Sequence, residues 1–163
     1  MVNGISDATG AVLGADLGCG NYKKAKIETN YFLGLAGILA LGIIVLIVIF
    51  ARPIVGMFGI TGKSSILLSV NIVRVLAVRI AFRFFNVIIF AALRAGGDSK
   101  FLMFIDSGIM WGVGIMITFF AASVLRLNNI LIVILLGQLE QLVRLIIGFK
   151  RYRSNAWLNT LTF

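Results

Sequence analysis

Long apolar stretches that alternate with short polar segments dominate this chain of 163 residues. They predict four transmembrane helices, at residues 30–51, 65–93, 101–125 and 129–149. A helix rises about 1.5 Å per residue, so about 20 residues cross a hydrocarbon core of ~30 Å, and each stretch is long enough. The first helix should end at Arg52, because Pro53 disfavours helix at the residue before it. We therefore expect an all-α fold, a polytopic membrane helical bundle.

A shorter apolar segment, residues 4–20, precedes these stretches and is broken by two aspartates. Gly10, Gly14 and Gly18 recur every four residues, so in a helix they share one face, at which another helix can approach closely. A flexible, glycine-rich leader is the alternative, and the spacing leaves both open. We treat the segment as the truncated end of a further membrane helix, so that residues 1–163 form a single membrane domain.

Basic residues gather at alternate ends of the predicted helices. Eight lie on one side: Lys23, Lys24, Lys26, Arg94, Lys100, Lys150, Arg151 and Arg153. Three lie on the other: Arg52, Lys63 and Arg126. The positive-inside rule then places the first side, with the basic tail at 150–163, in the cytoplasm. We expect a multi-pass protein of the plasma (inner) membrane, in contact with membrane lipid.

The composition supports a membrane protein and excludes several other classes. Hydrophobic residues make up 60% of the chain, and the mean hydropathy is +1.06. The net charge of +9 lies mostly at helix ends, so we expect no nucleic-acid partner. Histidine is absent and Cys19 is the sole cysteine, which excludes a His-based triad, a His-ligated metal site and an intramolecular disulfide. With no nucleophile–base pair visible, we expect neither an enzyme nor a metal site nor a cofactor, apart from a coupling ion.

Six polar residues within the apolar stretches form the candidate site: Asp106, Glu140, Arg79, Arg83, Asn86 and Gln141. Spacings of four and three residues place the two arginines and the asparagine on one helix face. Glu140 is also four residues before Arg144, the favourable order for an intrahelical ion pair. Charges inside a membrane are costly and normally face a bundle interior, a water-filled cavity or a partner.

Two interpretations of these residues stay open. If the three helix faces converge, they form a polar cavity whose carboxylates respond to nearby charge, as coupling to H⁺ or Na⁺ requires. The alternative is a fixed salt-bridge network that clamps the helices, with Arg79 and Arg83 in structural ion pairs and Arg74 at the outer interface.

Two segments resemble the multidrug and toxin extrusion (MATE) family of cation-coupled antiporters. Residues 14–26, GADLGCGNYKKAK, resemble the family's glycine-rich helix end and the basic segment after it. Residues 93–101, LRAGGDSKF, resemble its inter-helix segment LR-x-G-GD-[ST]-[KR]-F. Trp111 and the tail RYRSNAW at 151–157 fit the same pattern.

The resemblance implies twelve membrane helices in two bundles of six, of which this chain covers the end of the eighth through the twelfth. It also implies export of bulky, often cationic compounds through a cleft between the bundles, driven by H⁺ or Na⁺. Family members more often have small or polar residues where Arg79 and Arg83 stand. The family's cation-site acids in this bundle lie on its seventh and tenth helices, and the stretch 74–93 that matches the tenth has no acid. Asp106 and Glu140 are therefore proposed from chemistry alone.

The inter-helix segment also has a structural explanation. Gly96 and Gly97 favour a tight turn, and Asp98 or Ser99 is suited to cap the next helix. Arg94 belongs to the same motif and should hold the turn on the cytoplasmic side. We expect a structural role for these residues.

The expected function is thus part of a cation-coupled multidrug antiporter, namely part of its C-terminal bundle. We expect a fragment that is incompetent alone, or one chain of a pair completed by an N-terminal six-helix half. The alternative is a stand-alone four-helix membrane protein, such as a homo-oligomeric exporter, a holin-like pore or an assembly subunit.

Overall fold

The structure, a computed structural model, describes residues 2–120, 123 and 130–158. Over these residues it is helical without a strand. The elements in chain order are α1 (Val2–Gly18), α2 (Tyr22–Gly56), α3 (Lys63–Ala95), α4 (Ser99–Ile109), the π-helix η1 (Met110–Ile115), α5 (Met116–Phe119), α6 (Ile130–Gly137), α7 (Leu139–Arg153) and the 3₁₀-helix η3 (Ala156–Leu158).

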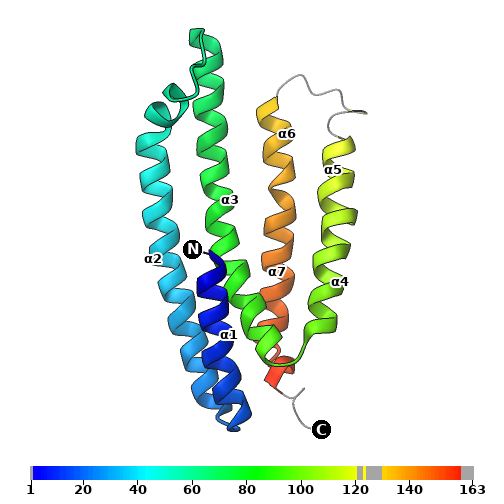
Figure 1. Ribbon diagram of the computed structural model, residues 1–163. Helices are drawn as coiled ribbons and strands as arrows, with labels where there is room; N and C mark the ends of the chain where they lie inside the picture. The colour runs from blue at the N-terminus through cyan, green and yellow to red at the C-terminus, as the bar shows by residue number, and fades with distance from the viewer. Residues whose placement is uncertain (1, 121–122, 124–129, 159–163) are drawn as a thin grey trace.

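Four helices are long and apolar enough to cross a membrane: Tyr22–Gly56, Lys63–Ala95, Ser99–Phe119 and Ile130–Arg153. The long pair α2 and α3 stands beside a second pair, made by α4–η1–α5 and by α6–α7, while α1 covers the lower part of the first pair (Figure 1). This confirms the predicted helical membrane bundle. The structure does not describe residues 121–122 and 124–129. Arg126, the end of the predicted third helix and the start of the fourth fall in these ranges.

Helix α2 extends beyond both of its predicted ends. It begins at Tyr22 instead of residue 30. The hydropathy pattern missed residues 22–29 because they are polar, but most of them favour helix. The predicted end at Arg52 is wrong, because the helix continues through Pro53 to Gly56. A proline this close to a helix end removes one hydrogen bond, and Ala51 and Val55 on either side are buried against Val70 of α3.

The N-terminal segment forms helix α1, so the alternative interpretation of a flexible, glycine-rich leader is wrong. Leu13 and Leu17 are buried in the core that α1 shares with α2, α3 and α7. A Cβ atom added at Gly10, Gly14 or Gly18 would meet nothing within 4 Å. The glycine face of α1 is thus free of close helix contacts within the part of the chain that is described.

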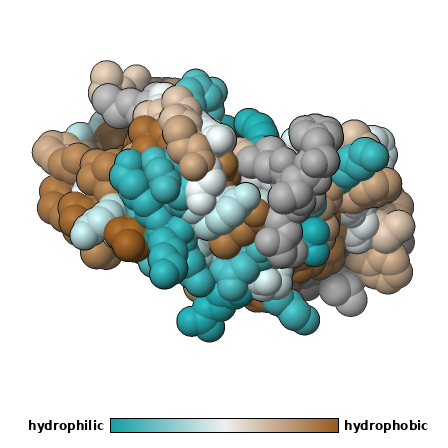
Figure 2. All heavy atoms as spheres, turned by 90° about the horizontal axis from the view of Figure 1, so that it is seen from below, coloured by the Kyte–Doolittle hydropathy of each residue, from teal (hydrophilic) through white to brown (hydrophobic). Residues whose placement is uncertain are grey.

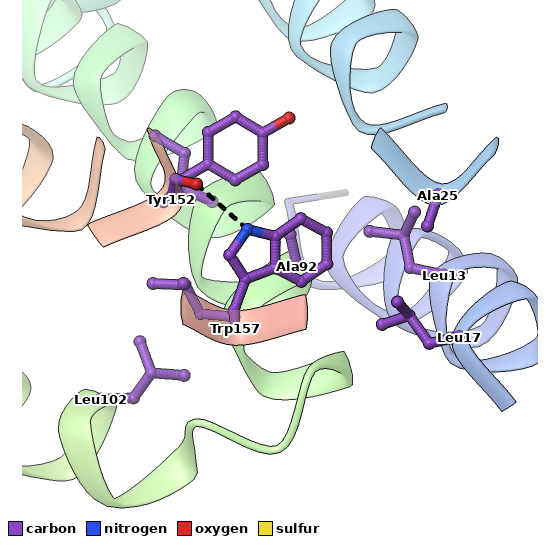
Figure 3. Packing of buried hydrophobic residues seen from close by; sticks show 9 residues of the cluster. Leu13, Leu17, Ala25, Ala92, Leu102, Tyr152 and Trp157 are labelled. Carbon is purple, nitrogen blue, oxygen red and sulfur yellow. Dashed lines mark hydrogen bonds between the residues drawn. The ribbon is translucent and has the colours of Figure 1, made fainter. Parts of the chain in front are cut away.

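Among the described residues, the cluster with the most buried hydrophobic side chains lies at the end where α1 joins α2, and it includes Trp157. The indole is fully buried, and its Nε1 donates a hydrogen bond of 3.1 Å to the Tyr152 carbonyl oxygen. Figure 3 shows Leu13 and Leu17 on one side of the indole and Leu102 on the other. The prediction of a basic tail from residue 150 is wrong at its start, because α7 continues to Arg153 and the segment after it packs into the core. Residues 159–163 are not among those described.

The turn between α3 and α4 packs closely against the end of the chain that the structure describes. Gly97 adopts a positive φ of 84°, and a Cβ atom on Gly96 would overlap the Trp157 carbonyl oxygen. Asp98 occupies the N-cap position of α4, but within the described residues no side chain caps that helix, so the capping prediction is wrong. The Asp98 carboxylate instead accepts a 2.7 Å hydrogen bond from Arg151 Nε, which ties the turn to the end of α7.

Candidate functional site

A cavity of about 630 Å³ lies between α1, α3, the α4–η1 segment and α7. All six residues of the predicted site line it: Asp106, Glu140, Arg79, Arg83, Asn86 and Gln141. Asn3, Ser6 and Asp7 of α1, Val87, Phe90 and Arg94 of α3, Met110 and Arg144 complete the wall. The structure therefore brings the three predicted helix faces together, and Asp106 and Glu140 share one cavity.

Arg144 joins the two carboxylates, one from each of two helices. Its Nη1 lies 2.6 Å from Asp106 Oδ1, and its Nη2 lies 2.6 Å from Glu140 Oε1. The Arg144 and Glu140 side chains are 15% and 16% exposed, whereas that of Asp106 is 60% exposed. The predicted intrahelical pair of Glu140 and Arg144 is confirmed. Arg144 was missing from the predicted site, although its spacing from Glu140 was a signal for including it.

The helices that carry this triad of Asp106, Arg144 and Glu140 are both irregular beside it. The regular helix changes to the π-helix η1 four residues after Asp106, and the α6–α7 helix is interrupted at Gln138. In η1, Gly114 leaves room for Glu140, whose Oε2 would lie 2.7 Å from a Cβ atom at that position. π-helical turns inside longer helices are frequent at functional sites, because they redirect the side chains around them.

An uncharged contact joins α3 to α7 beside the triad. Asn86 Nδ2 donates to the Gln141 carbonyl oxygen at 3.1 Å and to Gln141 Oε1 at 3.2 Å. Both side chains are buried, so this contact fixes the spacing of the two helices. Asn86 Oδ1 is buried without a hydrogen-bond partner within the described residues.

Arginines occupy the α3 wall of the cavity. Arg79, Arg83 and Arg94 fall within about 60° of one another around a helix with 100° per residue, and all three are exposed. No ion pair involves any of them among the residues that the structure describes, so the interpretation of Arg79 and Arg83 as members of structural ion pairs is wrong there. Arg94, predicted to be structural, also lines the cavity, whereas Arg74 does not.

The charges of the cavity wall can be compared directly. It carries four arginines, at positions 79, 83, 94 and 144, and three carboxylates, at positions 7, 106 and 140. The wall is therefore net positive even when every acid is ionised. No group of three His, Cys, Asp or Glu side chains that could hold a metal ion comes together in the described part of the chain.

The family model MatE matches residues 1–120, most of the chain. This protein belongs to the MATE family. A curated MATE relative, described as an uncharacterized transporter, YisQ, of Bacillus subtilis (strain 168), is 29% identical over 143 residues. Those residues are 84% of this chain but 29% of the relative, so the chain spans less than a third of that protein's length. No solved structure matches this MATE chain.

Proposed function

We propose that this chain forms part of an antiporter that exports organic compounds in exchange for H⁺ or Na⁺. It acts in the plasma membrane, with its basic end and its C-terminus in the cytoplasm. The observation that carries the proposal is the triad, in which one guanidinium lies 2.6 Å from each of two carboxylates on different helices. MATE membership and the similarity to a protein described as a transporter support a transporter over a holin-like pore or an assembly subunit.

The charge of the triad suits the binding of one monovalent cation. With both acids ionised, two carboxylates face a single guanidinium, so the triad carries one net negative charge. One H⁺ or Na⁺ brings it to neutrality, and Arg144 remains paired with the other carboxylate. Other charges that face the triad across the cavity are Arg79, Arg83 and Arg94 of α3 and Asp7 of α1.

The transporting unit contains helices beyond those described above. The chain corresponds to less than a third of its curated relative, and the arginine wall of its cavity is exposed. We infer that an N-terminal six-helix half, in the same polypeptide or in a second one, faces this wall and completes the cleft. The cavity would then lie between the two halves.

Dye efflux tests the proposal in cells that lack their own exporters. The chain is expressed alone or with its candidate N-terminal half, and the cells are loaded with ethidium or carboxyfluorescein, which differ in charge. We expect efflux of at least one dye that requires both halves and an imposed H⁺ or Na⁺ gradient. Glu140→Gln should lower this efflux to the rate of cells with empty vector, because Arg144 and Asp106 then form a neutral pair that leaves no negative charge for a cation to balance.

Glu28→Gln is the matched control, because Glu28 lies 3.4 Å from Lys24 at the basic end and does not line the cavity. It should export at the wild-type rate. Gradient-driven efflux by Glu140→Gln at the wild-type rate, with equal protein in the membrane, would overturn the proposed coupling. Efflux from the chain alone would overturn the need for a second half.

A further inference from the structure

The arginines on α3 lie deep in the membrane span and have a polar cavity in front of them. Arg79 is the midpoint of α3, sixteen residues from Lys63 and from Ala95, or ~24 Å from each end. Arg83 is one turn further toward the basic end. An arginine side chain is too short to reach the membrane surface from the middle of such a helix. Both guanidinium groups must therefore be solvated or paired within the cavity that they line.

The carboxylates of the cavity do not neutralise these two arginines. Asp106 and Glu140 already share Arg144 at 2.6 Å each. Asp7 lines the same cavity, but within the described residues it makes no ion pair with an arginine. The wall is thus divided, with the triad on the α4 and α7 side and free guanidinium groups on the α3 side.

This division disfavours an organic cation as the occupant of the cavity. The wall is net positive with all acids ionised, and it becomes more positive when one acid of the triad takes up a proton. A guanidinium is a planar fork of N–H donors that matches carboxylate and phosphate groups. Phe90 lies on the same α3 face, between Arg83 and Arg94, and offers an apolar surface to the rest of an organic anion.

We propose that Arg79 and Arg83 bind the anionic group, a carboxylate or a phosphate, of the compound that this protein transports. The inference rests on the proposed function for the use of the cavity as the substrate site, and it adds the sign of the substrate's charge. It departs from the cationic substrates that the family resemblance implies. The anionic group belongs to a soluble organic anion or to the headgroup of a lipid.

Equilibrium binding tests this without an ion gradient, so the result does not depend on coupling by the triad. The full chain is placed in phosphatidylcholine nanodiscs, and binding of radiolabelled benzoate and of benzylammonium, its cationic counterpart, is measured. We expect benzoate to bind more tightly than benzylammonium. Arg79→Gln and Arg83→Gln should each weaken benzoate binding roughly 10-fold or more, the typical effect of losing a charge-assisted hydrogen bond.

Arg74→Gln provides the matched control, because Arg74 is on the same helix but does not line the cavity. It should bind benzoate as the wild type does, and Arg83→Lys, which keeps the charge without the fork, should fall between the wild type and Arg83→Gln. Circular dichroism and gel filtration confirm that each variant is folded. In discs that also contain phosphatidylglycerol, competition with benzoate would assign the site to a lipid headgroup, and unchanged binding would assign it to a soluble anion.

Three results would overturn the proposal: wild-type benzoate binding by both Arg79→Gln and Arg83→Gln, an equal loss in Arg74→Gln, or tighter binding of benzylammonium than of benzoate. Because benzoate binding is measured without an ion gradient, a failure of coupled export would leave the anion site standing. A failure of benzoate binding would in turn leave the coupling test unaffected.

Discussion

At the scale of single residues, close contacts decide which positions tolerate change. Gly96 packs against the carbonyl group of Trp157, a backbone atom that cannot rotate away from an added methyl group. Trp157 in turn is fully buried, and its ring stacks on Tyr152 with centroids 5.6 Å apart. The structural importance of this motif glycine therefore lies in a contact with a residue 61 positions later in the sequence.

We predict that Gly96→Ala destabilises the protein by about 1–3 kcal/mol, the usual effect of overpacking a tight core. Thermal unfolding in detergent, followed by circular dichroism, measures the change. Gly14→Ala is the control, because a Cβ atom at Gly14 meets nothing within 4 Å and alanine favours helix over glycine. Equal melting temperatures for Gly96→Ala and the wild type would show that the turn can move away from Trp157.

The six candidate residues were predictable one by one, but their grouping was not. Helical spacing places Arg79, Arg83 and Asn86 on one face without any structure. Whether that face meets Asp106 and Glu140 depends on how three helices pack, and a single sequence carries no signal for this. The spacing of Arg144 predicted an ion pair with Glu140 alone, whereas the structure pairs it with both acids.

At the scale of the elements, the segment Met110–Ile115 shows what an apolar pattern conceals. Its sequence, MWGVGI, is as apolar as a regular membrane helix, yet it forms a π-helical turn beside Glu140. Hydropathy predicts that a helix exists but not how tightly it is wound. The error at Pro53 has a different cause, because there the burial of Ala51 and Val55 outweighs the local preference of the proline.

Gly114→Ala tests the role of this turn. The added methyl group would lie 2.7 Å from Glu140 Oε2, the end of a flexible side chain, so the carboxylate should move while the fold is kept. We expect a melting temperature at or above that of the wild type, and a several-fold loss of gradient-driven dye efflux.

Gly108→Ala, in the regular part of the same helix, has nothing within 4 Å of its Cβ position and serves as the control. It should export at the wild-type rate. If both variants export equally, the position of the Glu140 carboxylate against η1 does not matter for transport.

At the scale of the whole molecule, many hydrophilic residues gather at one end. Seen from the end where α1 joins α2, hydrophilic residues extend across the middle of the face, with hydrophobic residues among them and at its left and right margins (Figure 2). The same end carries the turn between α3 and α4 and the end of α7 (Figure 1). This is the end that the positive-inside rule assigns to the cytoplasm.

The single cysteine gives a direct test of this orientation. Cys19 is exposed in the turn between α1 and α2, at the basic end. A membrane-impermeant maleimide should label it in inverted vesicles but not in intact cells. The variant Cys19→Ser with Thr61→Cys, whose new thiol lies in the turn at the opposite end, should show the reverse pattern. Labelling of Cys19 in intact cells would mean that the basic end faces outward.

Sharing of one arginine by two helices also has a mechanical consequence. Asp106 belongs to α4, whereas Glu140 and Arg144 both belong to α7. The ion pair between Arg144 and Asp106 therefore connects the two helices. Neutralising Asp106 removes this connection. Neutralising Glu140 leaves Arg144 paired with Asp106 alone, which strengthens the ion pair between the two helices. Under the proposed coupling, the acid that takes up the ion would therefore decide whether α4 is released from α7 or drawn toward it.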